Sequence, residues 1–282
     1  MAVILKGSDV SRAMKSKMTA DIDKLKRSGI FPHLAIVRLG ERPDDLAYER
    51  SAVKKCEGLG IRCTVFSYRE EISQEELIRE IKKLNRDDSI HGILIFRPLP
   101  RHIGEGVIKN VIDPGKDVDC LSPVNVAKVF EGDDSGFAPC TPEAVMEILD
   151  FYRIPIEGKN VVVVGRSMVV GKPVSMLLLR KHGTVTICHT RTRDRKEICR
   201  NAEILEVAAG KPGIITREDV GEGAAVIDVG INMDAGGNLC GDVLFDEVSE
   251  KAGYITPVPG GVGTVTTSVL ARHVVQAAMR TL

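Results

Sequence analysis

The sequence predicts an α/β protein of two domains, the second of which is Rossmann-like, with a doubly wound parallel sheet. Apolar runs of strand length alternate with helical segments in both halves of the chain, which is typical of parallel strands covered by helices. Four consecutive valines at 161–164 indicate a strand that is buried on both faces. A stretch dense in Pro, Gly, Asp and Ser between Pro114 and Thr141 interrupts the alternation and marks the boundary between the domains.

The first half is expected to hold three helices and three strands. A helix is predicted at 10–28, because apolar residues recur there at helical spacing and Gly29 and Pro32 follow. The other predicted helices are 43–58 and 73–85, and the predicted strands are 34–37, 63–66 and 92–96. The helix at 73–85 opens with Ser73 and Glu76, which together form a capping-box pattern.

The second half is expected to begin with a helix that has Thr141 as its N-cap and Pro142 in its first turn. The predicted strands are 160–164, 184–188, 202–207 and 225–229. Pro and Gly are too frequent at 256–263 for regular structure, and a last amphipathic helix is predicted at 265–282. We therefore assign 1–140 to the first domain and 141–264 to the second, and expect 265–282 to pack back on the first.

Composition and charge argue against several classes of protein. The 39 basic and 39 acidic residues cancel, so the charge favours neither nucleic acid nor an anionic membrane as a partner. No apolar run reaches the roughly 20 residues that cross a bilayer, and the N-terminus lacks a secretory pattern, which predicts a cytoplasmic protein. The 7 cysteines form no C-x-x-C pair and the 6 histidines no H-x-x-x-H pair, so neither disulfides nor a metal site is expected.

The segment from Gly165 to Pro173 is the main candidate for a binding site. Gly165 ends the valine strand and Gly171 opens the next helix, so free backbone N–H groups and the positive end of the helix dipole would face a phosphate. The glycines are spaced G-x-x-x-x-x-G rather than G-x-G-x-x-G, so an ordinary strand–turn–helix is the alternative.

The end of the following strand bears on which dinucleotide would bind. In this fold a carboxylate at that point binds the ribose of NAD, whereas a basic side chain accommodates the 2′-phosphate of NADP. The sequence has Arg191 there and no carboxylate at 188–192, and Arg166 lies in the preceding glycine loop. Two arginines favour NADP through charge-assisted hydrogen bonds, with a solvated surface role for Arg191 as the alternative.

Seven stretches carry longer motifs in a fixed order. They are K-D-V-D at 116–119, P-C-T-P at 139–142, G-R-S and V-G-K-P within 165–173, T-V-T and H-T-R-T within 184–192, V-I-D-V-G-I-N at 226–232, G-D-V at 241–243 and T-P-V-P-G-G-V-G at 256–263. Together they resemble the bifunctional methylenetetrahydrofolate dehydrogenase/methenyltetrahydrofolate cyclohydrolase family over nearly the whole chain. The resemblance implies a catalytic N-terminal domain, an NADP-binding C-terminal domain, a folate cleft between them and a homodimer.

The resemblance also implies a reaction in one-carbon metabolism on tetrahydrofolate derivatives. Such enzymes transfer a hydride from 5,10-methylenetetrahydrofolate to NADP and then hydrolyse the methenyl cation to 10-formyltetrahydrofolate. By this resemblance Tyr48 would stack on the folate and Asp119 would hydrogen-bond the pterin ring. The residues that would contact NADP are Gly165, Arg166, Ser167, Thr190 and Ile231, with Arg191 added from its charge. Those that would line the cleft are Arg97, Pro98, Leu99, Pro257, Gly260 and Gly261.

The chain departs from the family pattern mainly at the folate side. The family pattern Y-x-x-x-K-x-K starts at Tyr48 and places Ala52 where the catalytic lysine stands, and V-Q-L-P-L-P places Phe96 where the glutamine stands. Further departures are Asp45 for a serine, Cys120 for a glycine, and Thr264 and Val265 for the P-M of P-M-T. Because a positioned base contributes about 10²–10⁴-fold to such a hydrolysis, the cyclohydrolase step is the one expected to weaken.

Three side chains are candidates to replace the lysine. Lys55 shares a helical face with Tyr48 but lies one turn beyond Ala52. Arg97 stands beside Phe96 but stays protonated and cannot act as a base. Asp45 is a candidate acid or base, with a first-turn helix charge as the alternative. Beside a dehydrogenase of weak hydrolase activity, the sequence leaves open a bifunctional enzyme with a rebuilt site, a non-catalytic NADP- or folate-binding protein, and a dehydrogenase of another small molecule.

Overall fold

The computed structural model describes residues 1–234 and 236–282. The chain divides into two compact units, which we call the six-stranded unit and the three-stranded unit after their main sheets. The six-stranded unit comprises Met1–Arg12 and Thr141–Thr266, and the three-stranded unit comprises Ala13–Cys140 and Thr267–Leu282. The predicted two-part α/β architecture with parallel sheets is confirmed.

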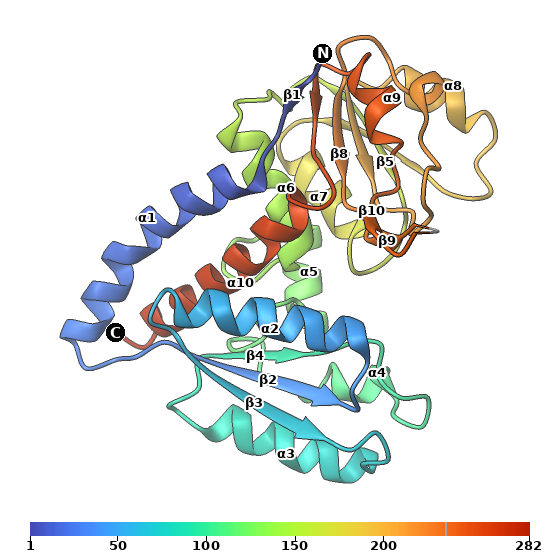
Figure 1. The fold of residues 1–282 in the computed structure, drawn as a ribbon. Coiled ribbons are helices and arrows are strands. Elements are labelled where there is room, and N and C mark those ends of the chain that lie inside the picture. Colours follow the sequence, from blue (N-terminus) through green and yellow to red (C-terminus); the bar gives the residue numbers. More distant parts are fainter. Residues whose placement is uncertain (235) are drawn as a thin grey trace. The chain divides into compact units, whose positions relative to one another are not determined.

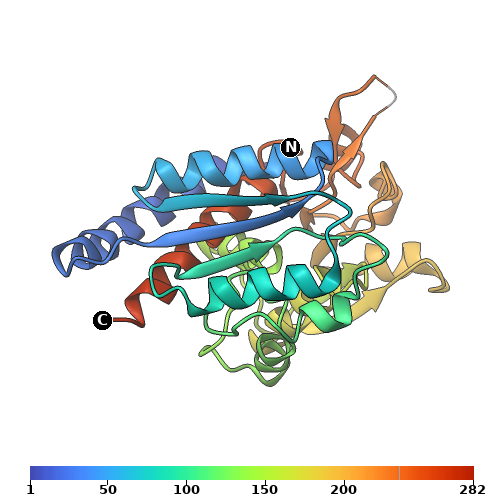
Figure 2. The ribbon, with the colours of Figure 1, turned by 90° about the horizontal axis from the view of Figure 1, so that it is seen from below.

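The three-stranded unit is built on a parallel sheet with the order β3-β2-β4. The strands are β2 (His33–Leu39), β3 (Arg62–Tyr68) and β4 (Gly92–Ile95). The connecting helices α2 (Pro43–Glu57) and α3 (Gln74–Arg86) lie on opposite faces of this sheet, as Figures 1 and 2 both show. Six of the seven β2 residues are buried for that reason, which accounts for the continuous apolar run in the sequence.

Local sequence signals set the ends of these helices. The Ser73 hydroxyl accepts a hydrogen bond from the Glu76 N–H at 3.2 Å, so α3 begins where the sequence predicts. Pro43 occupies the first turn of α2, where its missing N–H costs nothing, and Gly58 follows the last residue.

The six-stranded unit contains a fully parallel sheet with the order β1-β11-β8-β7-β5-β6. The strands are β1 (Val3–Ile4), β5 (Asn160–Val164), β6 (Thr184–Cys188), β7 (Ile204–Val207), β8 (Ala225–Asp228) and β11 (Tyr254–Ile255). The chain runs from β5 to β6 on one side and then returns to β7 on the other side of β5. This reversal is the topological switch point at which doubly wound sheets bind ligands, at the carboxyl ends of the strands.

The remaining helices and strands complete the fold. The helices are α1 (Gly7–Arg27), α4 (Glu105–Ile108), α5 (Pro123–Glu131), α6 (Cys140–Phe151), α7 (Gly171–Arg180), α8 (Arg195–Arg200), α9 (Phe245–Ser249) and α10 (Val262–Met279), with a short 3₁₀ turn at Arg217–Asp219. The strands β9 (Asn232–Met233) and β10 (Leu239–Cys240) form an antiparallel pair.

Three details differ from the sequence prediction. The first twelve residues belong to the six-stranded unit because Val3 and Ile4 pair with Tyr254 and Ile255, a two-residue strand too short to show in a sequence pattern. α6 begins at Cys140, so Thr141 lies inside the helix and is not its cap. α10 begins at Val262, directly after the glycine pair, and ends at Met279.

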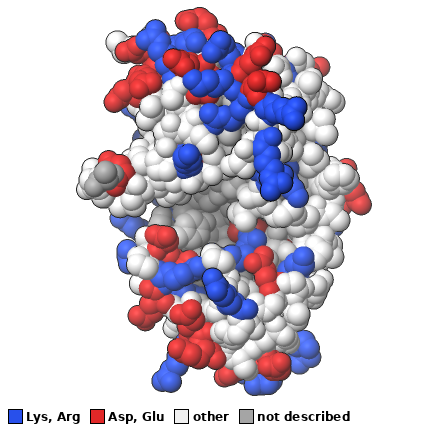
Figure 3. Space-filling model, turned by 90° about the vertical axis from the view of Figure 1, so that its right-hand side faces the viewer, with Lys and Arg blue, Asp and Glu red and all other residues white. Residues whose placement is uncertain are grey.

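The described part of the chain contains no helix both long and apolar enough to cross a membrane. Lys and Arg are interspersed with Asp and Glu on the face shown in Figure 3, as the zero net charge leads one to expect.

Glu206 is a buried carboxyl group in the middle of the six-stranded sheet. It lies on β7 between Val163 and Ile227 of the neighbouring strands, is fully buried, and neither side-chain oxygen has a hydrogen-bond partner among the residues that the structure describes. Burial first, and then the nearby carboxylates of Asp228 and Asp242, raise the pKa of Glu206 well above its usual value. Holding this group in the neutral form costs folding free energy at neutral pH.

We expect Glu206→Leu to stabilise the protein by about 1–3 kcal/mol at pH 8, because it replaces an unpaired buried polar side chain with an apolar side chain of similar volume. Since the folded-state pKa of Glu206 is raised, the wild type should lose stability as the pH rises above the unfolded value near 4.5. The difference between wild type and variant should therefore be larger at pH 8 than at pH 5, as measured by thermal unfolding. A variant no more stable than wild type at pH 8 would contradict this assignment.

Candidate functional site

The loop between β5 and α7 brings backbone against backbone. Gly165 has a φ of 153°, and a Cβ there would meet the carbonyl oxygen of Ala208 at 2.5 Å. A Cβ on Gly171 would overlap the carbonyl of Gly165 and lie 2.8 Å from the Arg166 nitrogen. Only glycine fits both positions, so the wide G-x-x-x-x-x-G spacing is a structural requirement of this turn.

The same loop leads into the N-terminus of α7, which is the positive end of the helix dipole. Arg166 and Ser167 are exposed, and the Ser167 hydroxyl accepts a hydrogen bond from the Val170 N–H at 3.0 Å. The 10 residues of α7 begin directly after this loop, so the positive end of the helix dipole is directed at it, although the Lys172 N–H donates to the Ser167 carbonyl at 3.0 Å and Pro173 has no N–H. The residues present therefore fit a phosphate group, as the sequence predicts.

A second basic side chain follows the neighbouring strand. β5 and β6 pair in parallel with Val164 opposite Cys188, so the loops after them leave the same edge of the sheet. The Arg191 N–H donates to His189 Nδ1 at 3.1 Å, and the His189 N–H donates to the Thr192 hydroxyl at 2.9 Å, which fixes this turn. The side chains of Thr190 and Arg191 remain exposed.

Two buried carboxylates order the loops at the ends of β7 and β8. Asp242 accepts three backbone hydrogen bonds of 2.6–2.9 Å from the residues at 209–211 and one of 2.8 Å from the Asn232 amide. Asp228 accepts backbone hydrogen bonds from Gly230, Asp242 and Val243. Burial raises the pKa of Asp228 to about 6, while these hydrogen bonds oppose the rise. Neither residue is assigned a role from the sequence, although both lie inside motifs that carry the resemblance.

The glycine-rich stretch before α10 also has a close-packed backbone. The Gly7 N–H donates to the Gly260 carbonyl at 2.9 Å, and a Cβ on Gly261 would meet the Pro257 carbonyl at 2.5 Å. Ile231, on the loop that follows β8, is 69% exposed. Pro257, Gly260, Gly261 and Ile231 thus belong to the six-stranded unit, together with the loops after β5 and β6.

The predicted folate residues of the first half of the chain lie in the three-stranded unit, whereas the predicted cleft residues Pro257, Gly260 and Gly261 lie in the six-stranded unit. Tyr48 is partly exposed on α2, and its ring packs edge-on against Phe96 with ring centroids 5.8 Å apart. Burial, followed by the neighbouring Cys140 and Asp119, raises the pKa of Tyr48 well above its usual value. Ala52 follows Tyr48 by one helical turn and is fully buried. A short apolar side chain and an aromatic ring therefore occupy the positions where the resemblance places a lysine and a glutamine.

Asp119 is positioned by a buried network around a turn. The Asp117 carboxylate accepts hydrogen bonds from the N–H groups of Leu121 and Ser122 at 2.8 and 2.7 Å. The His273 Nδ1–H donates to the Val118 carbonyl at 2.9 Å, and His273 is almost fully buried on α10. Asp119 Oδ1 accepts the Cys140 N–H at 3.0 Å, which also satisfies the first turn of α6. Sequence reasoning missed Asp117 and His273 because their roles depend on burial.

Arg97 and Cys120 flank Asp119. Arg97 Nη2 lies 3.6 Å from Asp119 Oδ2, and both side chains are largely buried. Cys120 has a φ of 58°, a left-handed conformation that favours glycine, which fits the family's glycine at this position. Pro98 is exposed and Leu99 partly buried on the segment that follows.

The other candidates for replacing the lysine have different neighbours. Both carboxylate oxygens of Asp45 accept hydrogen bonds from Arg42, at 2.8 and 3.0 Å, so this side chain is held by an ion pair in the first turn of α2. Burial and the neighbouring Lys15 lower the pKa of Lys55, which lies near the end of that helix. The partner that the structure gives Asp45 is therefore Arg42.

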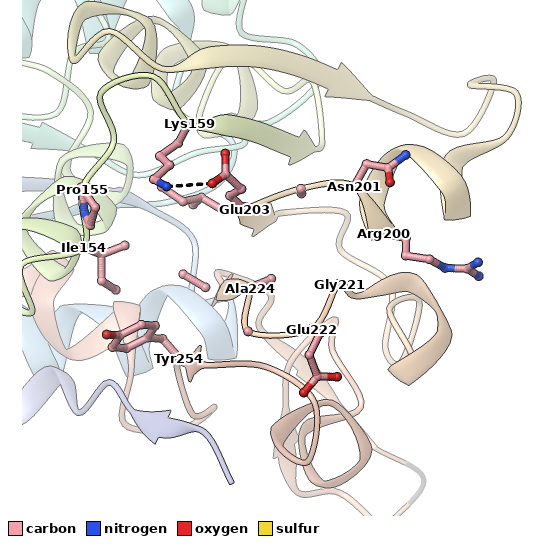
Figure 4. Close-up of a pocket in the computed structure, with 14 residues that line it drawn as sticks. Ile154, Pro155, Lys159, Arg200, Asn201, Glu203, Gly221, Glu222, Ala224 and Tyr254 are labelled. Carbon is pink, nitrogen blue, oxygen red and sulfur yellow. Dashed lines mark hydrogen bonds and ion pairs between the residues drawn. The ribbon is translucent and has the colours of Figure 1, made fainter.

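A cavity of about 430 Å³ lies in the six-stranded unit at the amino ends of β5, β7, β8 and β11. Figure 4 shows Tyr254 and Ile154 on one side and the Lys159–Glu203 ion pair, with an N–O distance of 2.8 Å, on the other. The predicted cofactor loops leave the opposite, carboxyl ends of these strands, so this cavity is separate from that site.

Two family descriptions match the chain. Residues 5–119 match "Tetrahydrofolate dehydrogenase/cyclohydrolase, catalytic domain", and residues 139–282 match the NAD(P)-binding domain of the same family. "Bifunctional protein FolD" of Clostridium kluyveri is 53% identical over 277 residues, covering 98% of both chains. The protein of the same name from Clostridioides difficile is 54% identical over 274 residues, covering 97% of this chain and 96% of that one.

Solved structures agree with these matches. The bifunctional FolD methylenetetrahydrofolate dehydrogenase/cyclohydrolase of Campylobacter jejuni has a TM-score of 0.98 and 42% identity, with full coverage of both chains. The methylenetetrahydrofolate dehydrogenase-cyclohydrolase of Trypanosoma brucei, complexed with NADP cofactor and inhibitor, has a TM-score of 0.94 and 38% identity. It covers 99% of this chain and 98% of that chain.

We expect Gly171→Ala to weaken NADP binding by about 10- to 100-fold, because the new Cβ would displace the Gly165 carbonyl and reshape the loop. Gly106→Ala is the matched control, since a Cβ there would meet no atom within 4 Å. Isothermal titration of both variants with NADP measures the effect. Equal affinity in the two variants would show that this loop does not bind the phosphate.

Proposed function

We propose that this chain, which belongs to the tetrahydrofolate dehydrogenase/cyclohydrolase family, is an NADP-dependent dehydrogenase of 5,10-methylenetetrahydrofolate. The observation that carries the proposal is the glycine loop at the switch point of the six-stranded sheet, with Arg166 and Arg191 following adjacent strands. The NADP complex of the Trypanosoma brucei relative supports this choice of cofactor.

In this reaction the methylene carbon loses a hydride with its electron pair and becomes the methenyl cation. NADP, when bound, supplies the hydride acceptor. The contribution of this chain is positioning. Asp119 is held by Cys140 and would fix the pterin ring, and Tyr48 would stack on it. No proton transfer is needed in this step, so the absence of a lysine at position 52 does not prevent it.

Arg166 and Arg191 would select NADP through its 2′-phosphate. Guanidinium groups bind phosphate in a bidentate manner and remain charged at every physiological pH. Gly165, Ser167, Thr190 and Ile231 would form the rest of the cofactor site, with Pro257, Gly260 and Gly261 near the nicotinamide.

The direct test is an assay of NADP reduction with methylenetetrahydrofolate. We expect turnover with NADP and a much weaker rate with NAD. Asp119→Ala should raise the KM for the folate by about 10- to 100-fold, because a charged hydrogen bond contributes about 1.5–3 kcal/mol. Unchanged folate affinity in this variant would remove Asp119 as the pterin anchor, and folate binding without turnover would favour a non-catalytic protein.

We further propose that hydrolysis of the methenyl product is slow. Ala52 is fully buried and Phe96 packs on Tyr48, so no basic side chain follows Tyr48 by one helical turn. The competing proposal, a fully bifunctional enzyme with a rebuilt site, is supported by the relatives, which share 50–54% identity and are named bifunctional.

Ala52→Lys combined with Phe96→Gln should raise the rate of methenyltetrahydrofolate hydrolysis by about 10²–10⁴-fold, since it restores a positioned base. Ser51→Lys is the control, because it adds the same charge at the adjacent exposed position of α2. Loss of methenyl absorbance measures hydrolysis without NADP. Rapid hydrolysis by the wild type would establish the bifunctional alternative, and single substitutions of Asp45, Lys55 and Arg97 would then identify the substitute group.

We also propose a homodimer and a cytoplasmic location. Exposed apolar side chains around the β9–β10 pair, namely Ile231, Met233 and Leu239, support association through the six-stranded unit.

A further inference from the structure

Arg97 and Asp119 present a cation and a carboxylate side by side beyond β4. A parallel bridge joins Ile93 of β4 to Asp117, so the chain at 116–119 runs along the edge of this strand. This arrangement brings the segment after β4 next to Asp119. Arg97 Nη2 and Asp119 Oδ2 are 3.6 Å apart, which is an ion pair but longer than a hydrogen bond.

Both partners retain hydrogen-bonding capacity. Asp119 Oδ1 accepts the Cys140 N–H at 3.0 Å, whereas Oδ2 is engaged by the charge of Arg97 alone among the described residues. Among the described residues, none accepts a hydrogen bond from the guanidinium of Arg97, although only 18% of this side chain is exposed. The Arg97 nitrogens are not among the fully buried side-chain atoms that lack a partner, so they reach solvent, and a ligand with a matching acceptor could take the place of that solvent.

A carboxylate acceptor beside a guanidinium donor matches one edge of a heterocyclic lactam. The ring N–H donates to the carboxylate, and the adjacent C=O accepts from the guanidinium. Phe96, the neighbour of Arg97, packs on Tyr48, so aromatic surface lies next to this charged pair. Aromatic surface beside a paired donor and acceptor suits a flat, polar-edged ring.

We propose that Arg97 is a specificity-determining residue that binds the 4-oxo group of the pterin ring, while Asp119 accepts the neighbouring N3–H. The inference rests on the proposed function, because it takes a tetrahydrofolate as the ligand. A 4-amino analogue presents a donor where Arg97 needs an acceptor and lacks the N3–H that Asp119 accepts. The site therefore discriminates 4-oxo from 4-amino pterins, since a mismatched edge leaves buried polar groups unpaired.

The test is the ratio of dissociation constants for tetrahydrofolate and 4-amino-4-deoxytetrahydrofolate, measured by titration calorimetry with NADP present. We expect the wild type to prefer tetrahydrofolate by about 10- to 100-fold and Arg97→Leu to lose most of this preference. Arg97→Lys keeps a charged donor and should retain part of it. The ratio reports recognition of the ring edge, which a purely structural role of Arg97 would not change.

Arg42→Leu is a matched control, since Arg42 also forms an ion pair in the three-stranded unit, with Asp45, and should keep the wild-type ratio. A preference that persists in Arg97→Leu, or wild-type protein that binds both ligands equally while oxidising methylenetetrahydrofolate, would overturn this inference alone. A wild type that binds NADP but neither pterin would overturn the proposed function, and this inference with it.

Discussion

The parallel pairing of β5 with both β6 and β7 is the constraint on which the cofactor side depends. After β5 the chain forms β6 on one side and then returns to form β7 on the other side. The loops that follow β5 and β7 therefore meet at the carboxyl end of β5, where their backbones are in contact. Gly165 lies against the Ala208 carbonyl and Gly171 against Gly165, so side chains are excluded at both positions. The proposed anion site depends on this packing, and the proposed preference for an extra phosphate depends on the adjacent arginines.

Buried carboxylates hold the loops in both units. Asp117, Asp228 and Asp242 each accept two or more backbone N–H groups, so the cost of burying the charge is offset by hydrogen bonds. Glu206 has the same chemistry without such partners among the described residues, and burial raises its pKa well above the usual value. The contrast shows that the number of nearby donors, and not burial alone, decides whether an acid orders a loop or destabilises a strand.

The folate side depends on a different pairing, between β4 and the chain at 116–119. It places Asp119 beside Arg97, while α2 places Tyr48 beside Phe96. The chemistry that this unit can support is therefore set by charge and aromatic surface. Hydride transfer depends on how the ring is held and hydrolysis on a positioned base, so Ala52 and Phe96 bear on the second step rather than the first.

The sequence by itself determined the fold class, most element positions and the glycine loop, because these depend on periodicity, turn chemistry and local motifs. It did not determine the pairing of β1 with β11, the start of α6 at Cys140, or the partners of Asp45 and Arg97. Some of those features arise from contacts between residues distant in the chain. The others depend on which charged side chain lies within bonding distance of its neighbour. Only the tertiary structure fixes such distances, and with them whether a charged side chain anchors a loop, pairs with a neighbour or faces a ligand.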